Sequence, residues 1–204
     1  MKKRASLKSP ARPERAGAVP ANYREVLYWR ITQSNWKLTV VNVLSLPLAG
    51  LMGLLFFGWA VLLKRMPDSL NLDLPRIISL VVAVALTLVL HELAHGLAMW
   101  AYGARPHFGI LWQGLMFYAT SPGHAFRRNR YVVVVLAPLV GLSLLALMAI
   151  LFSPPLVAVL LALCATVNGA GAVGDLWILL ITLRYSDRAY IMDERDGMRI
   201  FLPA

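Results

Sequence analysis

Two histidines and a glutamate stand in the order His-Glu-x-x-His within a long apolar stretch, at His91, Glu92 and His95. Residues i and i+4 of a helix lie one turn apart on the same face, so both imidazoles can reach one metal ion. The adjacent Glu92 is then placed to act as general base toward a water molecule. Because three fixed residues also recur by chance, the motif alone makes zinc-dependent hydrolysis a hypothesis.

The position of Glu92 strengthens that hypothesis. It is an ionisable group in an otherwise unbroken apolar run, where a charge near the centre of a spanning helix costs roughly 2.5–3.5 kcal/mol. The alternative is a polar cluster that only holds helices together, but such contacts more naturally use Ser, Thr or Asn. The cost therefore favours a functional site.

A third ligand is needed, because a catalytic zinc usually takes three protein ligands and one water. Asp175 is the other acid within the apolar runs, in the stretch from Asn168 to Trp177. The histidines and Asp175 fall roughly 12–15 Å from the same end of their predicted helices. We therefore predict one zinc ion per chain, bound by His91, His95 and Asp175, with a polar helix contact as the alternative for Asp175.

Other polar residues are weaker candidates. Asn168 is predicted to bind substrate by a hydrogen bond to a substrate carbonyl, with ligand orientation or a helix contact as alternatives. His107 and His124 follow the motif and are more typical of an interface than of a third ligand. A thiolate site is excluded because Cys164 is the one cysteine. Iron or cobalt would fit the same imidazole and carboxylate ligands.

The composition indicates what positions these residues. The chain of 204 residues is 59% apolar and only 15% charged, which excludes an ordinary soluble globule. Four apolar runs each exceed the roughly 20 residues that cross a bilayer. They span residues 38–63, 77–102, 131–152 and 156–183. We predict an all-α integral membrane protein with four transmembrane helices, forming a domain over residues 38–184.

The loop after the second run contains two short apolar stretches between Pro106 and Pro122, separated by Gln113 and Gly114. This pattern predicts a short β-hairpin in the cytoplasmic loop, with an amphipathic surface loop as the alternative. The stretches at 108–120 could bind an extended peptide as an added strand.

The charge distribution predicts the orientation. The net charge is +10, and all Lys and Arg residues outside the spans except Lys64, Arg65 and Arg76 fall on the side of the termini. The positive-inside rule therefore places both termini in the cytoplasm. Residues 1–37 form a basic segment whose first half is expected to be disordered, whereas 23–36 suit the membrane interface. Residues 185–204 are expected to form a cytoplasmic tail.

The basic segment also indicates partners. We expect it to bind anionic membrane lipid rather than nucleic acid, because its first twenty residues lack interleaved aromatic side chains. A cleaved signal peptide is not expected, because the first apolar run is too long.

Four segments resemble a known family: HELAHG at 91–96, YATSPG at 118–123, LAPLV at 136–140 and N-x6-D-L at 168–176. They are similar to small bacterial membrane proteins described as putative zincin peptidases. More distantly, they resemble the site-2 protease group of intramembrane zinc metalloproteases. The resemblance covers roughly residues 75–195 and implies the same zinc ligands and base, and location in a bacterial plasma membrane. In the site-2 protease pattern Asn and two prolines precede Leu-Asp-Gly, whereas here glycines follow Asn168 and Leu176 follows the aspartate.

The expected function is an intramembrane zinc metallopeptidase that hydrolyses a peptide bond in or next to a membrane-spanning substrate near the cytoplasmic leaflet. The alternative is a non-catalytic membrane protein with a structural zinc or a peptide-binding role. A metal transporter is less favoured, because a single deep site with so few acids leaves no evident ion path. Three protein ligands and a water favour catalysis, and four protein ligands favour structure.

Overall fold

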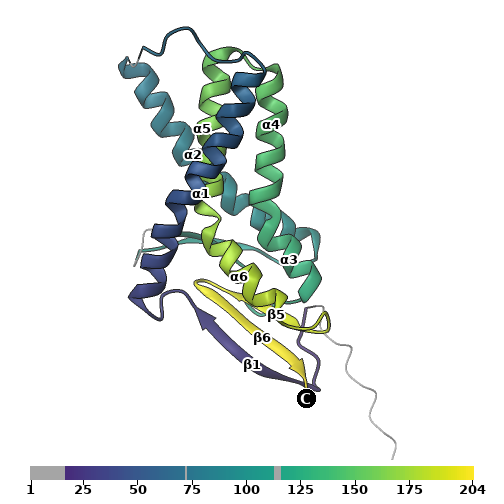
Figure 1. Ribbon diagram of the computed structural model, residues 1–204. Helices are drawn as coiled ribbons and strands as arrows, with labels where there is room; N and C mark the ends of the chain where they lie inside the picture. The colour runs from purple at the N-terminus through teal and green to yellow at the C-terminus, as the bar shows by residue number, and fades with distance from the viewer. Residues whose placement is uncertain (1–16, 72, 113–115) are drawn as a thin grey trace, which may run out of the picture.

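The computed structural model describes residues 17–71, 73–112 and 116–204. Helices form an elongated bundle, and a β-sheet lies across one end of it, where the C-terminus is also found (Figure 1). The expected disorder of the basic segment's first half and the turn at Gln113 and Gly114 lie outside the described residues.

Two long helices begin the bundle, α1 (Asn35–Leu62) and α2 (Leu74–Ala101), each of 28 residues. The α2 N-terminus is fixed by Asp73, whose side chain accepts the backbone N–H of Arg76 at 3.0 Å. A carboxylate at this position satisfies an amide that has no partner within the helix.

The remaining helices are interrupted. α3 (Arg128–Ala137), the π-helix η1 (Pro138–Leu142) and α4 (Ser143–Phe152) together make a third apolar helix of 25 residues. α5 (Pro155–Gly171) and α6 (Val173–Leu183) are bent by 43° at their junction. Three helices are long and apolar enough to cross a membrane, or four if the bent pair forms one span. The chain is a mostly helical membrane protein, and four is the upper count of spans.

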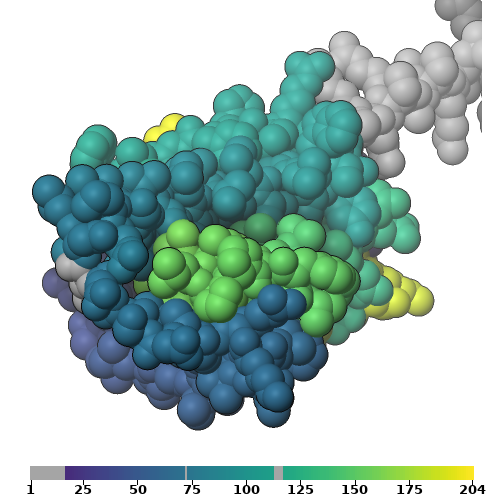
Figure 2. Space-filling view, turned by 90° about the horizontal axis from the view of Figure 1, so that it is seen from above, coloured from purple at the N-terminus to yellow at the C-terminus, as the bar shows by residue number. Residues whose placement is uncertain are grey.

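The half of the bundle away from the sheet packs around small side chains. Figure 2 views the molecule from this end, with α5 in light green at the centre and α1 in blue along one side. Farther along α5, toward the sheet, a Cβ on Gly169 would lie 2.4 Å from Met52 Cγ, so this glycine allows α1 to approach closely. The buried side chains of this half are Phe56, Ala60, Ile150, Ala158, Ala162 and Ala165.

The sheet joins the two ends of the chain. β1 (Tyr23–Arg30), β4 (Ala125–Arg127), β5 (Tyr190–Glu194) and β6 (Gly197–Pro203) are arranged in the order β1-β6-β5-β4, with every pair antiparallel. β1 pairs with β6 from Tyr23 opposite Pro203 to Arg30 opposite Gly197. Both ends of the described chain therefore lie on one side of the bundle.

This sheet corrects the all-α prediction. The segments at 1–37 and 185–204 are expected to be separate, but β1 and β6 are adjacent strands of one sheet. The expected place of residues 23–36 at the membrane interface stays a prediction. The pairing joins residues far apart in sequence, which periodicity does not reveal. The available sequence signal was the pair Asp196-Gly197, which is typical of a turn, between two short stretches with β-prone residues.

The predicted hairpin between the second and third apolar runs is confirmed. β2 (His107–Leu111) and β3 (Met116–Thr120) pair antiparallel, with His107 opposite Thr120. It packs on α2 at Gly96, where a Cβ would meet the Phe108 ring at 2.3 Å. The glycine that follows the second histidine of the motif, Gly96, therefore leaves the space into which the hairpin packs against α2.

Candidate metal centre

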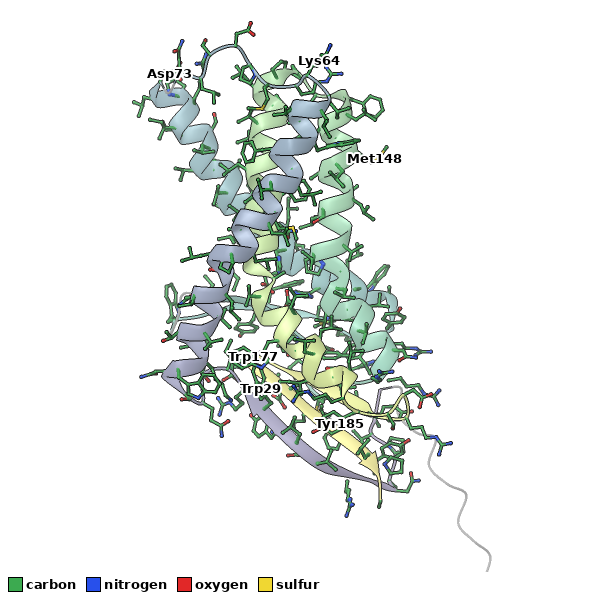
Figure 3. All side chains as sticks on the ribbon, in the orientation of Figure 1. Trp29, Lys64, Asp73, Met148, Trp177 and Tyr185 are labelled. Atoms are coloured by element: carbon green, nitrogen blue, oxygen red, sulfur yellow. The ribbon has the colours of Figure 1, made fainter. Side chains whose placement is uncertain are left out.

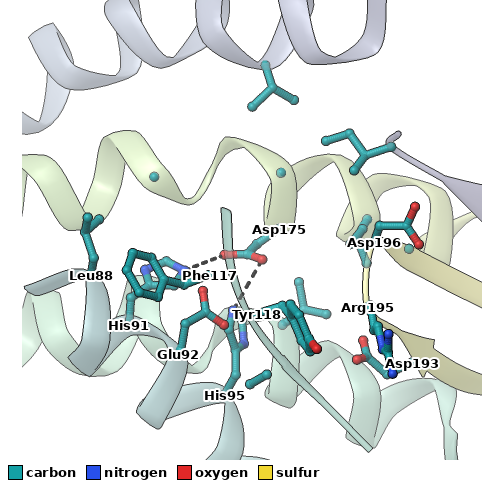
Figure 4. A pocket seen from close by; sticks show the side chains of 18 of the residues that line it. Leu88, His91, Glu92, His95, Phe117, Tyr118, Asp175, Asp193, Arg195 and Asp196 are labelled. Atoms are coloured by element: carbon teal, nitrogen blue, oxygen red, sulfur yellow. Dashed lines mark hydrogen bonds and ion pairs between the residues drawn. The ribbon is translucent and has the colours of Figure 1, made fainter. Parts of the chain in front are cut away.

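The structure brings together the three residues predicted as metal ligands. His91 and His95 lie on α2, and Asp175 lies in the first turn of α6. The Asp175 carboxylate lies between the two rings (Figure 4), with Oδ2 3.0 Å from His91 Nε2 and Oδ1 3.3 Å from His95 Nε2. One ligand atom from each residue lies within 4.8 Å of the other two.

These distances suit zinc. Two ligand atoms bound about 2.1 Å from a tetrahedral ion lie about 3.4 Å apart, which is close to the two separations observed. Both histidines are buried, and Asp175 is 19% exposed at its side chain. Two imidazoles and a carboxylate are a donor set that zinc accepts. This buried group can bind a metal ion.

The bend between α5 and α6 positions the third donor. α5 ends at Gly171, and α6 begins at Val173 with Asp175 in its first turn. The first turn of a helix carries partial positive charge from its free amide groups, which favours an ionised carboxylate. The bend therefore gives Asp175 both its place opposite α2 and a favourable electrostatic environment.

The outer nitrogen of each histidine is held by a protein oxygen. His95 Nδ1 is 2.8 Å from the Val134 carbonyl, and His91 Nδ1 is 3.0 Å from Asn168 Oδ1. When Nδ1–H donates in both rings, each Nε2 presents its lone pair toward Asp175. This is the tautomer that a metal ligand requires.

Asn168 has both of its amide atoms engaged. Oδ1 accepts from His91, and Nδ2 donates to the Pro138 carbonyl at 3.2 Å. The side chain is 2% exposed. These contacts fit the ligand-orienting alternative for Asn168, and because Asn168 also lines the cavity beside the candidate ligands, the substrate contact stays a prediction.

Glu92 lies on the wall of a cavity of about 530 Å³ that also contains the three candidate ligands. Phe117 and Tyr118 of β3 line the cavity on the hairpin side (Figure 4). Glu92 also borders a second, apolar cavity of about 370 Å³ between α2 and the hairpin. The carboxylate therefore stands where two cavities meet.

A buried acid in the same cavity was missed by the sequence analysis. Asp193 of β5 is 8% exposed, and its Oδ1 accepts a hydrogen bond from the Tyr131 hydroxyl at 2.6 Å. Burial raises the pKa of Asp193 from its ordinary 3.8 to about 7. The residue was overlooked because it lies in the presumed tail; an acid at an inward position of an alternating strand was the signal.

The two weaker histidine candidates do not join the cluster within the described part of the chain. His107 is exposed, with Nδ1 3.0 Å from the Arg105 carbonyl. The His124 ring lies 4.6 Å from the Phe126 ring, centroid to centroid. Partial burial, with the nearby Arg130 charge, lowers the pKa of His124.

Fold and site together define a membrane protein with a buried His-His-Asp group that can bind a metal ion. The family model described as "putative zincin peptidase" matches residues 84–190, just over half of the chain. The protein belongs to this family. The match includes the three candidate ligands, Glu92 and the hairpin, and it begins after α1. No curated protein and no solved structure matches the chain.

Proposed function

We propose that this protein is a membrane-embedded zinc metallopeptidase that cleaves a peptide bond in or next to a membrane-spanning substrate. One observation carries the proposal: the His91, His95 and Asp175 donors converge beside Glu92 on the wall of a cavity. A base next to a three-donor zinc site is what amide hydrolysis needs. Membership of the zincin peptidase family supports the same chemistry.

The proposed reaction assigns a role to each group. Zinc, when held by the three ligands, supplies a Lewis acid that polarises the scissile carbonyl and acidifies a water molecule. Glu92 accepts the proton of the attacking water and then delivers it to the leaving amide nitrogen. Asn168 and the Val134 carbonyl keep the two imidazoles oriented throughout.

The substrate is proposed to reach Glu92 as an extended peptide along the hairpin. Within the described residues β2 and β3 pair only with each other, so their outer edges are free to bind another strand. The cavity between the hairpin and α2 is lined by Val89, Leu93, Phe108, Ile110 and Phe117, which suits an apolar segment. An extended substrate also exposes the amide that a helix would bury.

The site lies in the half of the bundle next to the sheet, on the side of both chain ends. The excess of Lys and Arg on this side supports a cytoplasmic location for both termini in a bacterial plasma membrane. Cleavage would then occur near the cytoplasmic leaflet. The proposed relation to site-2 proteases rests on the same order of parts: the motif on one spanning helix and an aspartate on a later one.

The second candidate is a non-catalytic protein with a structural zinc. Such a site is closed by four protein ligands. In the described ranges the metal-binding group has three members, and Glu92 lines the open cavity beside them. This favours the catalytic candidate.

Two measurements test the proposal. Elemental analysis of detergent-purified protein should find about one zinc per chain in the wild type and little in His91→Ala and Asp175→Ala. Proteomic mapping of new N-termini should then find membrane-protein fragments in cells producing the wild type but not Glu92→Gln. Zinc without any Glu92-dependent fragment would favour the non-catalytic candidate.

The hairpin has its own test. Deleting residues 107–120 with a short linker should abolish cleavage while zinc content and folding persist. Unchanged cleavage would exclude a role for the hairpin in substrate binding.

A further inference from the structure

The third apolar helix changes its hydrogen-bonding pattern beside the metal centre. It passes from α3 to the π-helix η1 at Pro138 and returns to α-helix at Ser143. In an α-helix the carbonyl of Val134 would accept the backbone N–H of residue 138. Proline has no N–H, so this carbonyl lacks its usual partner.

The freed carbonyl is the one that holds a candidate metal ligand. Val134 O is 2.8 Å from His95 Nδ1, and both residues are buried. An unpaired carbonyl in the apolar interior costs free energy, and the imidazole N–H removes that cost. The proline therefore creates the acceptor, and His95 uses it.

The same proline also supports the other histidine. Its carbonyl accepts from Asn168 Nδ2 at 3.2 Å, and Asn168 Oδ1 lies 3.0 Å from His91 Nδ1. Pro138 and Asn168 are both buried. The outer nitrogens of both histidines thus depend on one turn of the third helix.

We propose that Pro138 is a positioning residue of the metal centre: by lacking an N–H it keeps the Val134 carbonyl available to His95, and its own carbonyl fixes Asn168 against His91. The inference rests on the metal site of the proposed function, and it holds whether or not the protein cleaves peptides. Groups that orient metal-bound histidines typically contribute 10- to 100-fold to metal affinity.

A second helical proline provides a matched comparison. Pro47 lies inside α1 and leaves the Val43 carbonyl without its helical donor. Val43 is 57% exposed, and in the described part of the chain its carbonyl receives no side-chain hydrogen bond. Substitution of Pro47 therefore restores a helical N–H opposite a carbonyl that contacts no candidate metal ligand.

The test measures zinc affinity by competition with a chromophoric chelator, in detergent, on the full chain. Pro138→Ala supplies an N–H that competes for the Val134 carbonyl, and we expect zinc to bind about 10-fold more weakly. Pro47→Ala should change the affinity less than about 2-fold. The Co²⁺ absorption spectrum should also change in Pro138→Ala and not in Pro47→Ala, because it reports ligand geometry rather than stability.

A backbone substitution isolates the cause. Incorporating the 2-hydroxy acid analogue of alanine at position 138 gives an ester that has neither the proline ring nor an N–H. We expect this variant to keep wild-type zinc affinity and Co²⁺ spectrum. Because it leaves the Val134 carbonyl free, it decides the question even if Pro138→Ala does not fold.

Each outcome has a definite meaning. Equal zinc affinity in Pro138→Ala and wild type would overturn the inference, as would equal weakening in the alanine and ester variants. Absence of zinc from the wild type would overturn both this inference and the proposed function. Zinc binding with the expected Pro138 effect but without proteolysis would refute the peptidase proposal alone.

Discussion

The two halves of the helical bundle differ in regularity. Away from the sheet, the second half of α1 packs with α4 and α5 through the alanine-rich cluster around Phe56, and these stretches are regular α-helix. Next to the sheet, the third apolar helix contains η1, and α5 and α6 are bent by 43° at their junction. All the candidate metal ligands lie in this second half (Figures 1 and 4).

The difference has a physical cause. A regular helix in lipid satisfies its own backbone groups and offers no acceptor to a side chain. The His95 imidazole is instead held by a backbone carbonyl that a helix has released, and the His91 imidazole by the side chain of Asn168. Pro138 at the start of η1 leaves Val134 O of α3 without a helical donor, Pro138 O accepts from Asn168, and the bend places Asp175. The uninterrupted helices contribute mainly to the stability of the protein, whereas the candidate metal centre is formed where helices are interrupted.

Three tryptophan side chains gather where the helical bundle meets the sheet. The Trp177 ring lies 5.8 Å from Trp29 and 5.7 Å from Trp36, and Lys37 Nζ lies 4.9 Å from the Trp29 ring. Figure 3 shows Trp29 and Trp177 where the bundle meets the sheet, and Lys64 and Asp73 at the opposite end. Tryptophans of this kind gather at membrane–water interfaces.

The largest expected effect is the loss of cleavage on substitution of Glu92, with zinc binding and stability kept. Glu92→Gln should lower cleavage by about 10³-fold, because the amide cannot accept the proton of water. Zinc content and melting temperature should not fall. Glu194→Gln is the control, since Glu194 lines the same cavity but pairs with Arg199; an equal loss in that variant would remove the special role of Glu92.

A substitution in the half of the bundle away from the sheet should lower stability and leave zinc binding unchanged. Phe56→Ala removes a fully buried ring between α1 and α5 and should lower the free energy of unfolding by roughly 3 kcal/mol. Zinc per folded chain should stay at the wild-type value. Thermal unfolding followed by circular dichroism, with elemental analysis of the folded protein, measures both quantities. A loss of zinc would show that the halves are coupled.

Asp193 should give the protein a pH-dependent stability. Its pKa is raised from 3.8 to about 7 by burial, so the folded state holds a proton that the unfolded state releases between these values. This contribution to stability is complete below about pH 4 and is lost as the pH rises through 7. Between pH 5 and 8 the loss should be on the order of 2 kcal/mol.

Asp193→Asn tests this dependence. The amide oxygen can still accept from the Tyr131 hydroxyl, but the side chain no longer titrates. The melting temperature of this variant should vary less between pH 5 and 8 than that of the wild type. Parallel pH profiles would assign the dependence to another group.

The smallest effect is expected at Gly96, where the hairpin packs against α2. A side chain on Gly96 must displace the Phe108 ring, so Gly96→Val should destabilise the protein by roughly 1 kcal/mol. If the hairpin binds substrate, cleavage should fall while zinc content is kept. Gly50→Val is the control, because no atom lies within 4 Å of a Cβ at that position.

The sequence was sufficient where the signal is local. The spacing of His91 and His95 on one helix follows from the helical repeat, and spanning helices follow from apolar length. Asp175 could be chosen because acids are so rare in the apolar runs. The hairpin was recognisable because its two strands are adjacent along the chain.

Only the tertiary structure decided the rest. The role of Val134 depends on a carbonyl that is released at the start of η1, and the roles of Pro138 and Asn168 depend on contacts between separate helices. No periodicity in the sequence indicates which histidine these groups will meet. The sheet pairs β1 with β6 from opposite ends of the chain, and it brings the buried Asp193 into the cavity. Local patterns determine helices and ligand spacing, whereas contacts between distant segments determine how the ligands are held.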